Sequence, residues 1–113
     1  MDKLERYRTL TMDLLNDCAV FANEHAQSDL KMQVLFDQEH DRYMVFRTGW
    51  WNQERIGAAT LYVRLDNSKI WIEEDMTEEG IAARFLDKGV PSDDIVLGFQ
   101  PPKMRPYTGF AAA

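Results

Sequence analysis

The side chains best suited to hold a metal ion form an acidic cluster in the second half of the chain. This cluster consists of Glu73, Glu74, Asp75, Glu78 and Glu79, and clustered carboxylates can bind Mg²⁺ or Ca²⁺. A strand would point Glu74 away from Glu73 and Asp75, and the spacing is not that of a calcium-binding loop. Glutamates at the start of a helix also stabilise its positive end. We therefore expect solvated, helix-capping carboxylates and no tight divalent-metal site.

The other reactive residue types lack the neighbours that catalysis or metal binding requires. His25 and His40 have no cysteine or second histidine at metal-ligand spacing. Cys18 falls on the apolar stripe of a predicted helix, where a cysteine behaves as a small hydrophobic residue. Asp29 and Lys31 have the Asp-x-Lys spacing of some nucleases, but such sites need further carboxylates on neighbouring strands. The sequence therefore predicts no catalytic residue, no metal ligand and no cofactor.

The C-terminal segment instead has the composition of a protein-binding surface. Arginine and tyrosine are frequent interface anchors, and the neighbouring prolines reduce the entropy lost on docking. We predict that Arg105, Tyr107 and Phe110 contact a partner, and that Arg105→Ala weakens binding by about 1 kcal/mol or more with little change in melting temperature. The alternative is that Tyr107 and Phe110 fasten the chain end to the core. Trp50 and Trp51 would face opposite sides of a strand, so one can be core while Trp51, if exposed, joins the partner surface.

Composition and charge limit the classes of protein to which the chain can belong. Its 113 residues, 45% hydrophobic and 28% charged, fit a single globular domain over residues 1–113. The net charge of −6 disfavours direct DNA binding through phosphates. A single cysteine fits a reducing compartment, and neither a membrane-spanning run nor the apolar core of a signal peptide is found. We expect a cytoplasmic protein that does not bind membranes.

Apolar periodicity predicts a long helix from about Lys3 to about His25. Asp2 followed by Glu5 resembles a capping box. The stripe recurs at alternating spacings of three and four residues and consists of Leu4, Tyr7, Thr11, Leu14, Cys18 and Phe21, widened by Leu10 and Leu15. Such a helix would be roughly 33 Å long, enough to lie across a whole sheet.

Period-two alternation predicts four strands, at residues 30–36, 43–50, 60–65 and 70–73. Their short polar connections favour hairpins, and hence an antiparallel meander. A second helix is predicted over residues 78–88, capped by Asp75 or Thr77 and stopped by Gly89 and Pro91. Residues 92–113 are expected to form one short strand or extended piece and then irregular chain. The predicted fold class is α+β: a long N-terminal helix packed on a four-stranded antiparallel meander, with a second helix and an extended C-terminal tail.

Short motifs spread over essentially the whole chain resemble the XisI-like family. The strongest is Asp94-Ile95-Val96-Leu97-Gly98-Phe99, followed by Pro102 and by Arg105-x-Tyr107-Thr108-x-Phe110-Ala111. The others are Met1-Asp2-Lys3-Leu4-Glu5-Arg6-Tyr7-Arg8, Gly49-Trp50, Lys69-Ile70-Trp71-Ile72, Thr77-Glu78-x-Gly80-Ile81-Ala82 and Gly89-Val90-Pro91. Their order and spacing together carry the resemblance.

The resemblance implies a compact α+β fold, a cyanobacterial source and a regulatory role. The family is named as a controlling factor for excision of the fdxN element, a DNA rearrangement in heterocyst-forming cyanobacteria, and is associated with a partner, XisH, and with a separate site-specific recombinase. It therefore implies an accessory regulator that acts through protein contacts while the recombinase performs the chemistry. Two alternatives stay open: an antitoxin-like inhibitor or subunit of an XisH-like nuclease, and a small metal-dependent enzyme built on the acidic cluster. A homo-oligomer is also compatible with the sequence.

Three positions depart from the family pattern. Members of the family tend to carry His-x-Asp on the third strand and a histidine after Gly-Phe near the end. The matching positions here are Tyr62, Arg64 and Gln100. If those polar groups form a site in the relatives, this chain lacks it.

Overall fold

A long helix, α1 (Lys3–Glu24), begins the fold and confirms the predicted N-terminal helix. The computed structural model describes residues 2–26 and 29–113, so Met1 of the opening motif lies outside the described residues. The Oδ1 atom of Asp2 accepts the backbone N–H of Glu5 at 2.7 Å, which is the predicted N-terminal cap. The helix buries a stripe that faces the sheet and consists of Tyr7, Thr11, Leu14, Leu15 and Ala19.

The predicted stripe is wrong in its last turn. Phe21 is 59% exposed, whereas Ala19 is buried. Residues that are two positions apart in the sequence are separated by about 200° around an α-helix. A buried stripe that passes through Ala19 therefore leaves Phe21 on the opposite side of the helix. The ring of Phe21 stacks on that of His25 instead, with 4.1 Å between the ring centroids.

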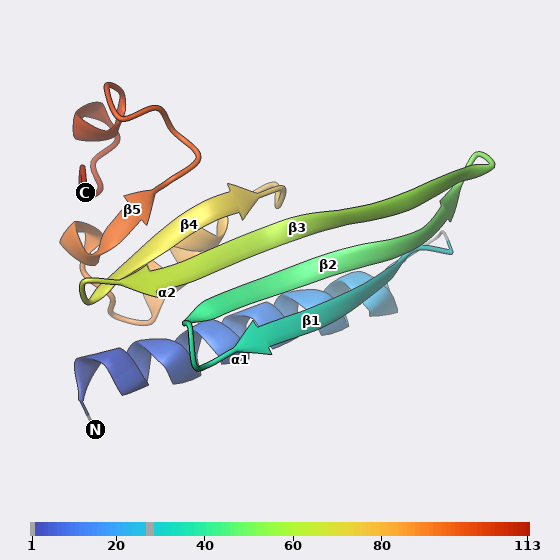
Figure 1. Cartoon of the computed structure of the whole chain (residues 1–113), viewed down its shortest axis with the longest axis horizontal. Coiled ribbons are helices and arrows are strands. Elements are labelled where there is room, and N and C mark those ends of the chain that lie inside the picture. The colour runs from blue at the N-terminus through green and yellow to red at the C-terminus, as the bar shows by residue number, and fades with distance from the viewer. Residues whose placement is uncertain (1, 27–28) are drawn as a thin grey trace.

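The strands form one five-stranded sheet in the order β1-β2-β3-β4-β5 (Figure 1). They are β1 (Lys31–Asp37), β2 (Arg42–Trp51), β3 (Glu54–Asp66), β4 (Lys69–Asp75) and β5 (Ile95–Leu97). The first four pair antiparallel in chain order, which confirms the predicted meander. The count of four is one strand short, because β5 returns after the second helix and pairs parallel to β4. A strand of three residues is too short for alternation to reveal its pairing.

The hairpin of β2 and β3 is longer than predicted, because β3 begins at Glu54 instead of residue 60. Its first part, Ile56-Gly57-Ala58-Ala59, lacks the bulky apolar alternation that marks a strand. The pairing continues past a bulge, where Val45 pairs with Leu61 and Phe46 with Ala59. Asn52 and Gln53 turn the chain with φ of 49° and 67°, as tight hairpins require.

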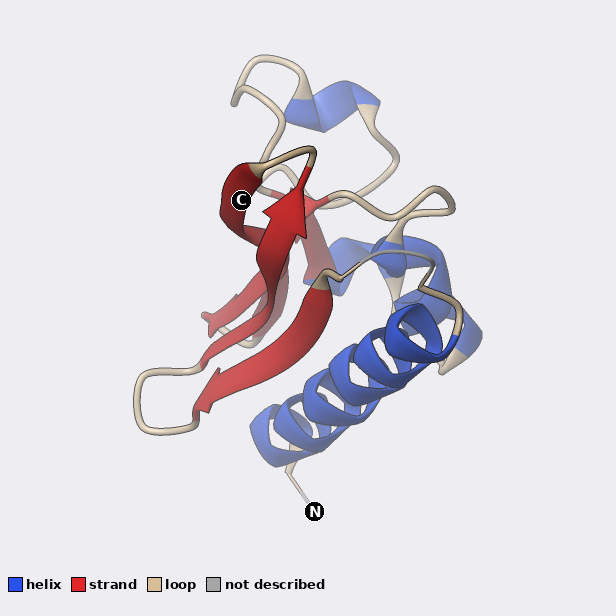
Figure 2. Ribbon diagram, turned by 90° about the vertical axis from the view of Figure 1, so that its right-hand side faces the viewer, coloured by secondary structure: helices blue, strands red, loops and turns tan. Residues whose placement is uncertain are grey.

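Helix α2 (Ile81–Asp87) is shorter than the predicted 78–88. Asp75 reaches forward and its Oδ2 accepts the N–H of Ile81 at 2.7 Å, while Gly80, with φ of 82°, lies just outside the helix. The prediction that Glu78 and Glu79 lie in the first turn of the helix is wrong, because both residues lie in the loop that precedes it. Both α1 and α2 lie on the same side of the sheet (Figure 2), where the buried core gathers.

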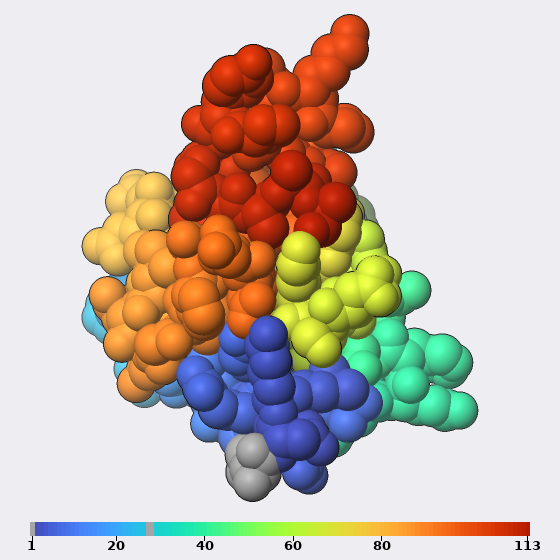
Figure 3. Space-filling model, turned by 90° about the vertical axis from the view of Figure 1, so that its left-hand side faces the viewer, coloured from blue at the N-terminus to red at the C-terminus, as the bar shows by residue number. Residues whose placement is uncertain are grey.

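The C-terminal residues 98–113 form a lobe at one end of the molecule, which we call the tail lobe (Figure 3). It follows the short 3-10 turn η1 (Ser92–Asp94) and β5, and contains a second turn, η2 (Arg105–Tyr107). Ala111 bridges to Val96 and donates its N–H to the carbonyl of Ile95 at 2.8 Å. The end of the chain thereby covers the outer edge of β5. None of the helices described is long and apolar enough to cross a membrane.

Candidate protein-binding surfaces

The tip of the β2–β3 hairpin exposes two tryptophans. The hairpin extends beyond the end of α1 (Figure 1), and Trp50 and Trp51 are 56% and 54% exposed. The guanidinium carbon of Arg55 lies 5.6 Å from the centroid of the Trp50 ring, a cation–π contact. One of the two rings could have been core, but both are exposed, because neither of the described helices α1 and α2 covers this part of the hairpin. We call Trp50, Trp51 and Arg55 the hairpin tip.

The tail lobe exposes a second group of apolar side chains. Tyr107 is 83% exposed, Met104 51% and Phe99 48%. Phe110, by contrast, is half-buried and packs against the core. Among the aromatic residues predicted in the tail, Tyr107 is therefore available to a partner and Phe110 fastens the chain end. Trp51 is the last residue of β2, and the β2–β3 hairpin ends at the opposite end of the molecule from the tail lobe (Figure 1), so the predicted residues do not form one surface.

Arg105 holds the tail lobe together from inside. Its Nε donates to the carbonyl of Gln100 at 3.1 Å and its Nη2 to that of Gly98 at 3.2 Å. Its guanidinium carbon also lies 5.4 Å from the centroid of the Trp71 ring. Hydrogen bonds from a charged group are stronger than those between neutral groups. These contacts give Arg105 an internal structural role.

Trp71 contacts two arginines on the side of the sheet that faces the tail lobe. The guanidinium carbon of Arg64 lies 4.3 Å from the centroid of its ring, in addition to the contact with Arg105 described above. Arg64 also donates to Glu73 at 2.9 Å and to Asp66 at 3.1 Å. Among the described residues, the buried Nε1 of Trp71 has no hydrogen-bond partner.

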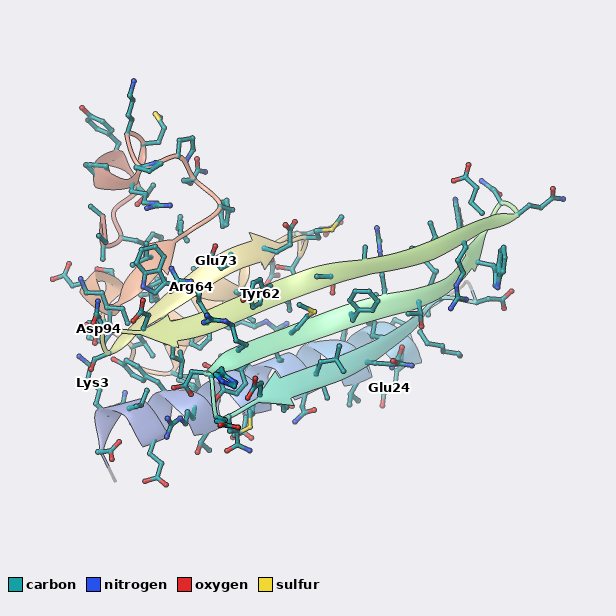
Figure 4. All side chains as sticks on the ribbon, viewed as in Figure 1. Lys3, Glu24, Tyr62, Arg64, Glu73 and Asp94 are labelled. Atoms are coloured by element: carbon teal, nitrogen blue, oxygen red, sulfur yellow. The ribbon has the colours of Figure 1, made fainter. Side chains whose placement is uncertain are left out.

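The three positions that depart from the family pattern, Tyr62, Arg64 and Gln100, lie in the region of Trp71 and its arginines. Tyr62 and Arg64 are two residues apart on β3 and point to the same side as Glu73 (Figure 4). The carbonyl of Gln100 is bonded to Arg105, which contacts Trp71. In this chain the region therefore contains a cation, its carboxylate partner and an aromatic ring.

Two part-buried aspartates, Asp94 and Asp41, connect α1 to the rest of the fold. Asp94 accepts from the hydroxyl of Tyr7 at 2.5 Å and pairs with Lys3 at 2.8 Å (Figure 4). Burial alone would raise the pKa of Asp94, but the hydrogen bonds from Lys3 and Tyr7 outweigh it and the pKa is lowered. Burial, with the bond to Asp94, raises the pKa of Tyr7 to about 12.

The second contact is at the turn between β1 and β2. Arg8 bonds both oxygens of Asp41, at 2.6 and 3.1 Å, and the hydroxyl of Tyr43 donates to the same carboxylate at 2.9 Å. The bond from Arg8 is the main reason that the pKa of Asp41 is lowered. Asp41 is thus held ionised at the point where α1 meets the sheet.

The acidic cluster is divided by the fold. Glu73 pairs with Arg64, while Asp75 accepts the N–H groups of Thr77 and Ile81 and serves as the cap of α2. Glu74 is exposed to solvent. Within residues 2–26 and 29–113, no group of three or more His, Cys, Asp or Glu side chains is placed to hold a metal ion.

The remaining candidates lie apart from one another. His40 contacts Asp37 at 2.8 Å in a surface turn, and His25 stacks on Phe21 at the end of α1. Cys18 is half-buried in a hollow between α1 and α2, and burial raises the pKa of its thiol. A thiol with a raised pKa is a weak nucleophile at neutral pH.

A surface that the sequence reasoning missed lies on the face of the sheet turned away from the helices. Leu35, Met44 and Tyr62 lie side by side on β1, β2 and β3 and line a shallow hollow of about 240 Å³. Leu35 is 54% exposed. Alternation indicates that such residues face one side, but it does not indicate which faces lack a covering element.

A long helix packed on an antiparallel meander, closed by a short parallel strand, defines a small α+β class of protein. The family model described as XisI protein matches residues 1–112, and the chain belongs to the XisI family. The crystal structure of fdxN element excision controlling factor XisI from Anabaena variabilis is 34% identical, with a TM-score of 0.83 over 99% of this chain and 100% of that chain.

A second solved structure, a XisI-like protein from Anabaena variabilis, is 31% identical and gives a TM-score of 0.87 over 97% of this chain and 99% of that one. No curated protein sequence matches the chain at a significant level. The predicted family resemblance is therefore confirmed over nearly the whole chain.

Proposed function

We propose that this chain is an accessory regulatory protein in the excision of a DNA element, of the fdxN type, and that it acts by binding other proteins. Family membership supports the regulatory role, since a relative with 34% identity over almost the full length is a controlling factor for excision of that element. Cutting and rejoining of DNA belong, on this proposal, to a separate recombinase.

The observation that carries the protein-contact mechanism is the hairpin tip. Two neighbouring tryptophans, each more than half-exposed, occupy a hairpin that extends past the body of the molecule. Large exposed apolar side chains mark interaction sites, and tryptophan and arginine are the residue types that most often dominate interface energies. Arg55 beside Trp50 gives the tip both types in contact.

The partner that we propose is an XisH-like protein, the companion implied by the family resemblance. An interface with the hairpin tip at its centre would bury both indole rings, with Arg55 at its rim. Tyr107 in the tail lobe, at the other end of the molecule, is a site for a second protein such as the recombinase.

Calorimetric titration with an XisH-like protein from the same genome tests the proposal. The double variant Trp50→Ala/Trp51→Ala should bind at least tenfold more weakly, a loss of about 1.4 kcal/mol. Both rings are largely exposed, so the variant should keep the stability of the native chain. Leu86→Ala, at a 40% exposed position on α2, serves as the control and should bind normally. Unchanged binding by the double variant would remove the hairpin tip from the interface.

A further inference from the structure

At the free edge of the sheet, a side chain from α1 bonds the backbone of Met32 on β1. The N–H of Met32 donates to Oδ1 of Asn23 at 2.8 Å, and its carbonyl accepts from Nδ2 of the same side chain at 3.0 Å. The amide of Asn23 thus occupies the place that a neighbouring strand would take. Alternate residues of an antiparallel strand point their backbone groups to the same side, so those of Val34 and Phe36 face this free edge too.

These backbone groups of Val34 and Phe36 have no partner within the part of the chain that the structure describes. Their strand pairs only with β2, opposite Val45 and Tyr43, and in both pairs the backbone groups point away from the partner strand. The other edge of the sheet differs, because Ala111 covers β5. An unpaired edge is a template for a further strand.

We propose that a second copy of this chain pairs antiparallel with β1, about a two-fold axis that passes beside Leu35. In this register Val34 of each copy lies opposite Phe36 of the other, and each such pair exchanges both N–H···O=C bonds. The sheets of the two copies then form one continuous sheet. This inference concerns self-association and does not depend on the proposed function.

Asn23 selects the register. If Val34 faced Val34 of the other copy, Phe36 would lie opposite Met32, whose groups are already bonded to Asn23. If Phe36 faced Phe36, Val34 would lie opposite Gln38, beyond the end of β1. The proposed register is the one that satisfies the free groups of both residues in both copies.

The side chains along β1 suit pairing with a second copy. Leu35, 54% exposed, would meet Leu35 of the other copy in a non-hydrogen-bonded pair, where Cα atoms are about 4.5 Å apart. Lys31 of one copy would lie beside the Asp37–Glu39 turn of the other, and the opposite charges attract. An edge with this self-complementarity favours a second copy over an unrelated strand.

The contact is small, so the dimer is expected to be weak. Stable interfaces bury about 1,200–2,000 Å² in total, more than one short edge strand supplies. Dissociation in the micromolar range or above is expected, and a concentration series from about 1 to about 500 µM spans it.

Disulfide trapping tests the register. In a Cys18→Ser background, which removes the native thiol, Leu35→Cys places two cysteines across the proposed axis at a separation that a disulfide can bridge. Gln33→Cys is the control on the same face of β1, since two such cysteines would be offset by about 13 Å along the strands. We expect Leu35→Cys to form covalent dimer at least ten times faster than Gln33→Cys under mild oxidation. Equal rates would overturn the proposed register.

Sedimentation of the native chain tests the dimer itself. Leu35→Lys places like charges across the axis and should shift the chain to monomer, whereas Leu86→Lys, a matched change at an exposed site on α2, should not. A native chain that stays monomeric over the whole series would contradict the proposal. The Asn23 amide would then serve only to satisfy the backbone groups of Met32 at the edge. A monomer that associates only on addition of an XisH-like protein would assign the edge to that protein instead.

Discussion

At the residue scale, Arg105 shows how surroundings change the role of an interface-type side chain. The sequence places it among prolines and aromatics, which favours a partner contact. The structure instead gives it two backbone carbonyls and the ring of Trp71. The sequence does not indicate that the carbonyl groups of Gly98 and Gln100 accept hydrogen bonds from a side chain several positions further along the chain.

The internal contacts of Arg105 reverse the expected effect of its removal. Arg105→Ala should lower the free energy of unfolding by about 1–3 kcal/mol, because two carbonyls lose a charged donor. Tyr107→Ala, at a position two residues further on that is 83% exposed, is the control and should stay within about 0.5 kcal/mol of the native chain. Urea denaturation measures both. If Arg105→Ala proves as stable as the native chain, other contacts hold the tail lobe, and the prediction that Arg105 contacts a partner is favoured instead.

Asp41 should make the stability of the chain depend on acid pH. Its pKa in the folded state is lowered, mainly by Arg8, below the value of about 3.9 for a free aspartate. Its contribution is therefore fully present above about pH 4 and is lost as the pH falls through the lower folded-state pKa. Asp41→Asn should be less stable than the native chain at pH 7, and the difference should shrink on acidification. Thermal melts at several pH values measure it, and a difference that grows in acid would contradict this assignment.

At the element scale, the β2–β3 hairpin depends on Gly49, where the chain passes close to the segment before β1. Gly49 has φ of 148°, and a Cβ there would lie 2.7 Å from the carbonyl oxygen of Asp29. Gly49→Ala should therefore destabilise the fold by about 2 kcal/mol or more, because both strain and a backbone clash oppose it.

Gly57 on the paired strand provides the control for this substitution. A Cβ at Gly57 would meet the Phe46 ring at 3.8 Å, an ordinary contact, so Gly57→Ala should be close to neutral or slightly stabilising. Chemical denaturation compares the two. Equal losses at both positions would show that the cost comes from the hairpin strands generally and not from the crossing at Asp29.

The elements that the sequence predicts well are those whose signals are local. The cap at Asp2, the long helix and the order of the first four strands follow from neighbouring residues. The parallel pairing of β5 and the late start of α2 depend on contacts between distant residues, such as Asp75 with Ile81. The candidate binding surfaces could not be predicted for the same reason. The exposure of Trp50, Trp51 and Leu35 depends on where α1 ends and on which face of the sheet it covers.

At the scale of the whole molecule, the exposed apolar groups are spread around the fold and do not converge on one cleft. The hairpin tip and the tail lobe, which carries Tyr107, lie at opposite ends of the molecule, and Leu35 is exposed on the face of the sheet turned away from the helices. With a net charge of −6, this distribution supports the proposed binding of proteins more than direct binding of DNA.

Fluorine NMR tests whether the chain acts through protein contacts at the hairpin tip. The chain has three tryptophans, so labelling with 5-fluorotryptophan gives one signal for each, and single Trp→Phe variants assign them. Addition of an unlabelled XisH-like protein should shift the signals of Trp50 and Trp51 while that of Trp71, which contacts Arg64 and Arg105, stays in place. Duplex DNA at physiological salt should shift none of them. Shifts of the Trp50 and Trp51 signals on adding DNA, or no shifts on adding the protein, would contradict a protein-binding role of the hairpin tip.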